Sequence, residues 1–358
     1  MSLYRVDFFD RSLNNVHHDV VDNLNIDEDY LAPEASDIYI QWTDAVNASD
    51  FVYISGAFNF LGVVTSVTDD NYRTKVSVKP FISLFDSNIL FDTDLQSKST
   101  STLEGVLADT IRKYWMNSGD DSVSISVLQL NTFTSTPNWG MNLKSDTEGT
   151  HYCIINFYSV LISRALTKYG ISITPEIDFS SKKIKLNIGA ISEVKKIQAD
   201  REGVGIKSFD INRNSQIINK LIVHNAENYA ESRIYYLHND GSYDRINTDR
   251  VLPVVFDVKV AIPGGDVTFA SAADDEASST FNNVDWDSLI ELYVELSDLL
   301  IDPLNFRIGT PAIVYHYGQP YNTILTCKSY SRADVILSFG AVRTTLTKKQ
   351  ILINNKFK

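Results

Sequence analysis

The residues that could do chemistry are few, and their spacing matches no common catalytic motif. The sequence contains no P-loop, no His-Glu-x-x-His, no Gly-x-Ser-x-Gly and no Cys-x-x-Cys. These motifs mark nucleotide binding, zinc-dependent hydrolysis, acyl-serine chemistry and thiol redox chemistry. Gly203 and Gly205 form a Gly-x-Gly pair, but a dinucleotide fingerprint needs a third glycine and a preceding strand. We therefore predict that the chain is not an enzyme and that it has no catalytic, cofactor-binding or metal-binding residues.

Two kinds of polar cluster come nearest to a metal site. His17 and His18 are adjacent, and adjacent side chains on a strand point to opposite faces, so one ion would rarely bind both. The acidic runs 27–29 and 274–276 lack the alternating spacing of an EF-hand loop. We interpret all of these residues as polar surface and solvated loops.

Cysteine and tryptophan give equally little support for a site. Cys153 and Cys327 are the only cysteines and lie in apolar runs, so we expect buried free thiols. Glycoside hydrolysis needs only two carboxylates a few ångströms apart, and nothing selects a pair among 45 acidic residues. A cell-wall or saccharide hydrolase, or a saccharide-binding protein with exposed aromatic residues, therefore stays open as the alternative. The tryptophans that could line a sugar site are Trp42, Trp115, Trp139 and Trp286, although large aromatic residues of β-rich proteins more often lie in the core.

The charge balance restricts the possible partners. A formal net charge of −13 argues against a protein that holds phosphate backbones, although an acidic surface would let DNA slide past without sticking. The N-terminus has no secretory signal, and no run of eighteen apolar residues occurs, so we expect a soluble protein with no membrane-spanning segment.

Composition and alternation favour strands at both ends of the chain. The sequence has 18 Tyr and 18 Phe among many Val, Ile and Thr residues, which suit a pleated surface. Strands are expected at 38–40, 51–54, 61–67 and 75–79, with a turn at 69–71, which together indicate a small β-barrel or sandwich. Further strands are expected at 217–224, 233–238, 311–317, 321–328 and 334–339, with a turn at 239–242.

Helical signals occupy the middle of the chain. The capping box 101–104 predicts a helix that begins there and ends near 117–119. A second helix is expected from Asn156 to Gly170, followed by strands at 171–174 and 184–188.

Two features are expected within the C-terminal region. Residues 264–283 are small and acidic and are the best candidate for a mobile loop. A third helix is expected at 286–300, with Asp285 as its cap and Pro303 after its end. Its buried stripe would be Leu289, Tyr293, Leu296 and Leu300.

These elements predict a mainly β protein with α+β parts. The expected domains are an N-terminal β-barrel at 1–95, an α+β domain at 96–190, and a second β-barrel region at 191–358. The third domain includes the loop 264–283 and the helix 286–300.

Seven segments, taken in order, carry a family resemblance. They are 51–56, 63–67, 81–86, 217–225, 235–241, 308–318 and 321–326. On these segments the chain resembles the phage baseplate hub and tail-tip family, which includes the myophage baseplate hub protein and the N-terminal part of siphophage tail-associated lysins. Because the sequence ends at Lys358 without an appended peptidase or muramidase segment, it resembles the short members.

The resemblance implies a structural role rather than an enzymatic one. It implies a multidomain hub fold with two tube-like β-barrel domains, and a homotrimer whose ring adapts the sixfold tail to the threefold tip. The implied partners are the distal tail protein or tail tube, the tape-measure protein and receptor-binding proteins. The ring would gate a channel for tape measure and DNA, and DNA would pass without specific binding. The location implied is the virion tail tip or baseplate, after assembly in the host bacterial cytoplasm.

Overall fold

The computed structural model describes residues 3–340 with gaps in that range. The gaps are 23, 71, 97–100, 121–122, 138, 140–142, 144–150, 212–219, 239–242, 248–254, 261–267 and 282–287. The chain divides into two compact units, one made of Met1–Ile211 and Ser288–Lys358 and the other of Asn212–Asp287. The division into domains at 1–95, 96–190 and 191–358 stays a prediction.

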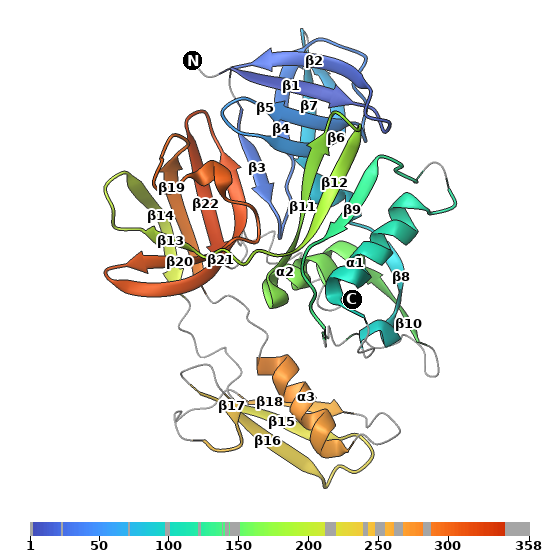
Figure 1. The fold of residues 1–358 in the computed structure, drawn as a ribbon, viewed down its shortest axis with the longest axis vertical. Coiled ribbons are helices and arrows are strands. Elements are labelled where there is room, and N and C mark those ends of the chain that lie inside the picture. Colours follow the sequence, from blue (N-terminus) through green and yellow to red (C-terminus); the bar gives the residue numbers. More distant parts are fainter. Residues whose placement is uncertain are drawn as a thin grey trace. The chain divides into compact units, whose positions relative to one another are not determined.

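Six strands near the N-terminus form one curled antiparallel sheet, drawn in blue in Figure 1. Along β7, Thr74, Val76 and Val78 are buried and the residues between them are not, because successive side chains of a strand point to opposite faces. The strands predicted between 38 and 79 are confirmed. In sheet order β2-β1-β5-β6-β7-β4, the bounds are β1 (Tyr4–Phe9), β2 (Asn15–Val21), β4 (Ser36–Gln41), β5 (Phe51–Ser55), β6 (Phe60–Asp70) and β7 (Arg73–Pro80).

Asp19 links the two edge strands of this sheet. Its Oδ2 accepts a hydrogen bond from the backbone N–H of Gln41 at 2.7 Å, which joins β2 to β4 and draws the sheet toward a closed barrel. The interior is mostly apolar. Its fully buried side chains include Val6, Phe8, Ile38, Ile40, Val52, Ile54, Val76 and Val78.

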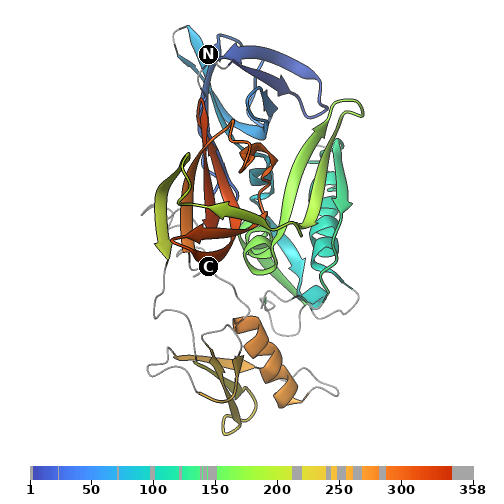
Figure 2. The same ribbon diagram turned by 60° about the vertical axis from the view of Figure 1, so that its left-hand side comes forward.

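The middle of the chain is an α+β arrangement, as predicted. Two small sheets, β10-β8 and β11-β12-β9, accompany the helices, and Figure 2 shows α1 beside the β9–β12 pair. The bounds are β8 (Asn88–Asp92), α1 (Leu103–Ile111), β9 (Leu128–Thr132), β10 (Tyr152–Asn156), α2 (Ser163–Tyr169), β11 (Ile171–Asp178) and β12 (Lys183–Ala190). Short 3-10 turns occupy Phe81–Phe85 and Thr93–Gln96, and wider helical turns occupy Arg112–Met116 and Phe157–Ile162.

Both helix predictions in this region are confirmed, with one change of detail. The cap of α1 is Thr102, whose side chain accepts from the Gly105 N–H at 3.1 Å, rather than Ser101. The second helical run begins after Asn156 and ends at Gly170, which adopts φ +67°. Glycine adopts this left-handed backbone conformation at little cost in free energy, because it has no Cβ.

A second curled sheet contains most of the C-terminal strands and is drawn in green and orange-red in Figure 1. Its path is β13-β20-β21-β22-β19-β14, and β3 (Ile26–Asp29) from the N-terminal part pairs with β21. The bounds are β13 (Lys195–Gln198), β14 (Val204–Ile211), β19 (Ser288–Glu295), β20 (Pro311–His316), β21 (Gln319–Tyr330) and β22 (Asp334–Gly340), with a 3-10 turn at Pro303–Asn305.

The helix expected at 286–300 is wrong, because Ser288–Glu295 is strand β19. Ile290, Leu292 and Val294 are buried with a period of two, while Tyr293, expected to be buried, is 42% exposed. The strand lies between β14 and β22, so its backbone groups find partners on both sides. The expected cap, Asp285, lies outside the described residues.

The second unit is a four-stranded sheet with one helix across it, as Figure 1 shows. Leu221, Val223 and Tyr235 of the sheet form a core with Phe269, Ala273 and Ala277 of the helix. The bounds are β15 (Lys220–Asn225), β16 (Ser232–Leu237), β17 (Tyr243–Asp244), β18 (Val255–Val260) and α3 (Phe269–Phe281).

Helix α3 overturns the mobile loop expected at 264–283. The alanines that made this segment look loop-like are good helix formers, and Ala273 and Ala277 lie four residues apart on one helical face. The ends of that segment and the turn expected at 239–242 lie outside the described residues. In the part of the chain that the structure describes, no helix has the length and apolar character needed to cross a bilayer.

Candidate functional site: two barrels and the junction between them

The two curled sheets share one strand order. Counted along the chain within each sheet, with β3 left out of the second sheet, the first, fourth, fifth, sixth and third strands are consecutive neighbours in both. They are β1-β5-β6-β7-β4 in the first barrel and β13-β20-β21-β22-β19 in the second. The second strand is placed differently in the two sheets: β2 lies beside the first strand, β1, whereas β14 lies beside the third strand, β19. If each sheet closed into a ring, the second strand would lie between the first and the third in both, so the two places are equivalent.

A matching irregularity strengthens the correspondence. The fifth strand is the longest in each barrel, with 11 residues in β6 and 12 in β21. Each fifth strand has a register shift against the sixth strand, between Val64 and Ser66 in one and between Leu325 and Cys327 in the other. Such bulges bend a strand and increase its twist, which lets a sheet curl. One difference remains, because β13 is parallel to β20 whereas β1 is antiparallel to β5.

In both barrels, the connection from the second to the third strand leaves the sheet. In the first barrel it contains β3, which pairs with β21 of the other barrel. In the second barrel it contains the whole of Asn212–Asp287. The chain thus uses the same position in each barrel for an excursion, once to join the other barrel and once to carry a separate unit.

Tyr30, immediately after β3, ties three parts of the chain together. Its backbone N–H donates to Thr326 of β21 at 3.0 Å, and its carbonyl accepts from the Tyr158 hydroxyl. Its own hydroxyl accepts from the Ile173 N–H at 2.9 Å. Burial raises the pKa of Tyr30, so the phenol stays protonated. The junction between the barrels and the α+β part is therefore buried and hydrogen-bonded.

Lys328 provides a buried charge at the same junction. Its Nζ lies 3.0 Å from Glu28 Oε2 and donates to the Phe306 carbonyl at 3.2 Å. It also lies 5.4 Å from the centre of the Tyr330 ring. Burial alone would lower the pKa of Lys328, but Glu28 and Tyr330 outweigh it and the pKa is raised. Burial raises the pKa of Tyr330 to about 12, although Lys328 acts in the opposite direction.

The acidic run 27–29 belongs to this junction and is not the solvated loop expected. Asp27 accepts from the Cys327 thiol at 3.0 Å and from the Ser329 hydroxyl at 2.7 Å. Asp29 is 2% exposed and accepts from two backbone N–H groups just after β3. Cys327 is buried, as predicted, and burial raises the pKa of its thiol.

The other acidic run, 274–276, lies within α3 rather than in a loop. Asp274 accepts hydrogen bonds from Arg233 and Tyr235 of the neighbouring sheet. His17 and His18 pair with adjacent residues of β1, at successive positions of β2. Among the described residues, no three metal-ligating side chains gather at one point.

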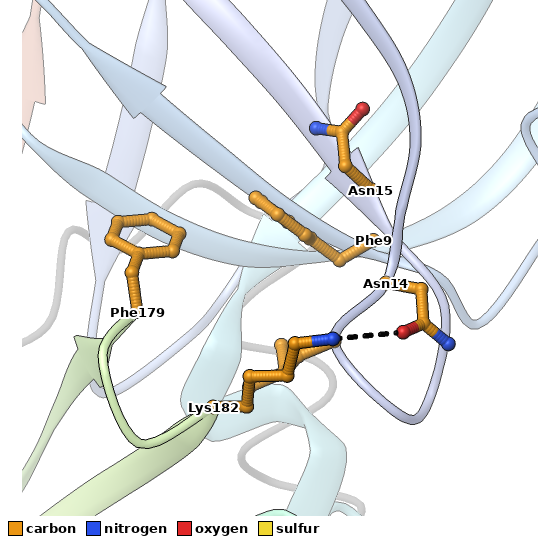
Figure 3. Close-up of a pocket in the computed structure, with 6 residues that line it drawn as sticks. Phe9, Asn14, Asn15, Phe179 and Lys182 are labelled. Carbon is orange, nitrogen blue, oxygen red and sulfur yellow. Dashed lines mark hydrogen bonds between the residues drawn. The ribbon is translucent and has the colours of Figure 1, made fainter.

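A shallow pocket of about 310 Å³ marks a second contact between the first barrel and the α+β part (Figure 3). Phe179, from the β11–β12 turn, lies 5.7 Å from the Phe9 ring and 5.3 Å from the Tyr53 ring. Lys182 Nζ donates to Asn14 Oδ1 at 3.1 Å. The lining side chains are apolar or amide groups apart from Lys182, whose amine is hydrogen-bonded to Asn14, and the contact joins the β1–β2 turn to the β11–β12 turn.

The sequence predicted two barrels but showed neither their matching strand order nor the junction between them. The matching strand order depends on long-range pairing, which no local periodicity reports. One signal could have been used, because the Asp27-Glu28-Asp29 run, with Ile26 before it and Tyr30 after it, has the length of a short strand.

Comparisons with solved structures agree with this architecture. A tail protein from Neisseria meningitidis MC58 is similar over 94% of this chain and 96% of its own, with 11% identity and a TM-score of 0.53. The 43 kDa tail protein of prophage MuSo2 from Shewanella oneidensis has 12% identity and a TM-score of 0.49, covering 95% of this chain and 98% of that one. A chain of the phage P2 baseplate in its activated conformation has 11% identity and a TM-score of 0.48, with coverage of 95% and 98%.

No protein-family model and no curated protein matches the sequence. The likeness is therefore one of fold, and it extends over nearly the whole chain. The structure is mainly β with two curled, half-barrel sheets and an α+β part, which confirms the fold class expected from the sequence. The chain therefore shares its fold with a tail protein, the one from Neisseria meningitidis MC58.

Proposed function

We propose that this chain is a structural hub protein of a phage tail, and that three copies form a ring of six barrels. The observation that carries the proposal is the shared strand order of the two barrels, with the bulge at the same strand. Two equivalent barrels per subunit give a trimer six similar elements around one axis. A sixfold tail tube could then rest on a threefold assembly, because each tube subunit would meet a barrel.

The junction supports the same role. A ring of this kind transmits load only if the two barrels of a subunit keep a fixed relation, and the Tyr30 and Lys328 contacts join them through buried hydrogen bonds and an ion pair. The strand pairing between β3 and β21 adds backbone hydrogen bonds across the two barrels. Buried polar groups that are hydrogen-bonded or ion-paired resist rearrangement, since breaking these contacts leaves charged and polar groups unpaired away from water.

The proposed partners are the distal tail protein or tail tube above the ring, the tape-measure protein inside it, and receptor-binding proteins. Tape measure and then DNA would pass through the central channel. The net charge of −13 supports passage of DNA without specific binding, since an acidic wall repels phosphate. The protein would be located in the virion, at the tail tip or baseplate, after assembly in the host cytoplasm.

The test is the mass of the purified full-length chain by light scattering, with electron-microscope class averages of the same sample. A mass three times 40.3 kDa and a ring of six similar lobes around a channel is the expected result. A monomer at high concentration that also fails to join purified tails would overturn the proposal. Saccharide binding or hydrolysis by that monomer would favour the alternative of a tail-borne hydrolase or glycan-binding protein.

A further inference from the structure

Three large apolar side chains near one end of the second barrel face water almost completely. Leu299 is 93% exposed, Leu300 is 82% exposed and Tyr317 is 83% exposed. Leu299 and Leu300 lie in the loop after β19, and Tyr317 lies in the turn between β20 and β21. Single exposed apolar residues are ordinary on a protein surface, whereas several large ones carried by loops that share an anchoring segment favour an interaction site. We call these three residues the leucine tip.

The loop that carries the two leucines is held in one shape. Asp298 Oδ1 accepts from the backbone N–H groups of Leu300 and Ile301, each at 2.9 Å. The Asp298 carbonyl accepts from the Asp302 N–H at 2.8 Å. These bonds and the Arg201 guanidinium hold the pKa of Asp298 below its usual range, so the carboxylate stays charged. A loop that is fixed before binding loses little conformational entropy when it binds.

Two consecutive residues connect the parts of the leucine tip. Arg201 bonds to the Asp298 carboxylate, which fixes the leucine loop. Asp200 accepts from the Tyr317 backbone N–H and lies within hydrogen-bond distance of His316 Nδ1, which fixes the tyrosine turn. Because Asp200 and Arg201 are neighbours in the connection between β13 and β14, both turns are anchored to the same short segment.

Acidic side chains dominate the same segments. Residues 200–202 and 295–307 contain five carboxylates and two guanidinium groups. Glu202, Glu295 and Asp302 are exposed. This charge disfavours an anionic membrane, nucleic acid or the acidic surface of a second copy as the binding partner. It favours a protein whose apolar groove has a basic rim.

We infer that the leucine tip is the docking point for a different protein of the same particle, one that presents an apolar groove with basic side chains around it. The two leucines and the tyrosine supply the buried centre of the interface, and the surrounding carboxylates orient the partner. This inference rests on the proposed function, because the tail particle supplies the partner.

The test places a photo-crosslinking residue, benzoylphenylalanine, at position 300 of the full-length chain in assembled particles. The matched control places it at position 72, because Tyr72 is 89% exposed in the turn between β6 and β7 of the first barrel. The expected result is an adduct from position 300 to one other particle protein, which position 72 does not give. A second variant, Glu202→Lys with Glu295→Lys, should reduce the yield of that adduct by roughly fivefold or more, because it removes the charge complementarity.

Each remaining outcome counts against one specific claim. Particles that contain the chain but give no adduct from position 300, or an adduct only to another copy of this chain, would overturn the docking inference alone. An adduct whose yield is unchanged by the two charge reversals would overturn the claim that the partner's groove has a basic rim. Failure of the unmodified chain to enter any tail particle would instead overturn the proposed function.

Discussion

Ile211 and Ser288 are opposite each other in the antiparallel pair of β14 and β19, although all of Asn212–Asp287 lies between them in the sequence. The ends of the two strands are therefore close enough for a hairpin turn. The second unit is thus an insertion into a hairpin of the second barrel.

Replacing Asn212–Asp287 by the two-residue turn Asn-Gly should leave the rest of the chain folded, because Asn-Gly matches the twist of a hairpin and the register is already set. Circular dichroism and thermal unfolding should show a cooperative transition within about 5 °C of the parent. Joining Leu237 to Val255 in the same way, inside the second unit, is the control and should disrupt that unit's sheet. Aggregation of the first variant would show that the barrel needs the unit.

Two glycines with nearly equal φ angles allow the effect of backbone strain to be distinguished from the effect of a steric clash at an added Cβ. Gly309 has φ +89° and a Cβ there would lie 2.6 Å from Ser172 Oγ, whereas Gly203 has φ +88° and open space around it. Gly203→Ala should lower the free energy of unfolding by about 1 kcal/mol through backbone strain alone. Gly309→Ala should lower it by about 1–3 kcal/mol more, because a packed side chain must also move. Urea denaturation measures both, and equal losses would contradict the difference.

Lys328→Met should lower the free energy of unfolding by about 3 kcal/mol, because it leaves the Glu28 carboxylate without its cation at a mostly buried site. The matched control is Lys75→Met, which breaks the much more exposed Lys75–Asp37 pair and should cost less than about 1 kcal/mol. Denaturant titration at neutral pH compares the two. A loss at position 328 no larger than at position 75 would mean that the junction is not held by this charge.

The same lysine gives a pH dependence at the alkaline end. The pKa of Lys328 in the folded chain is raised above its ordinary value of 10.5, so its stabilising effect is complete below that pH. The effect is lost as the pH rises through the raised value. The parent should therefore lose stability more steeply above pH 10.5 than Lys328→Met does. Parallel curves of unfolding free energy against pH would contradict this.

Glu104 is expected to give the opposite pH dependence of stability, at the acidic end. It is fully buried and accepts from Thr134 Oγ1 at 2.7 Å and from the Thr136 N–H and hydroxyl at 2.8 and 2.9 Å. Burial alone would raise the pKa of Glu104, but these hydrogen bonds outweigh it and the pKa is lowered. Its stabilising effect is thus present above the ordinary value of 4.5 and is lost as the pH falls through the lowered value.

Glu104→Gln should therefore cost about 2 kcal/mol at pH 7 and flatten the loss of stability below pH 4.5. Glu193→Gln, at an exposed carboxylate, serves as the control and should change neither quantity. Denaturant titrations between pH 3 and pH 7 report both effects. An unchanged acid slope in Glu104→Gln would show that the carboxylate is not charged in the folded chain.

The sequence predicts local elements well where one periodicity dominates. The alternation in β7 and the spacing in α1 each had a single interpretation, and both are confirmed. The segment Ser288–Glu295 was compatible with both a strand and a helix, because Leu289 and Tyr293 also fit the apolar stripe of a helix. What decides it is the pairing with β14 and β22, which are remote in the sequence. Tertiary context overrides a local pattern in such cases.

The prediction of a mobile loop at 264–283 was wrong for a different reason. Its core-facing residues in α3 include Ala272, Ala273 and Ala277, which give a weak hydrophobic signal among acidic and serine residues. Alanine has the highest helix propensity but a small apolar surface, so a composition-based argument for mobility outweighed a propensity-based argument for helix. The resemblance implied two tube-like barrels, but their shared strand order could not be predicted, since it exists only in the order of strand pairing.

The pairing of β3 with β21 also orders the events of synthesis. Residues 26–29 leave the ribosome early, but their partners, 327–330, are made some three hundred residues later. During that interval one edge of the N-terminal segment has unpaired backbone groups that could join a strand of another nascent chain. Translation speed and chaperone supply should therefore control the yield of correctly joined barrels.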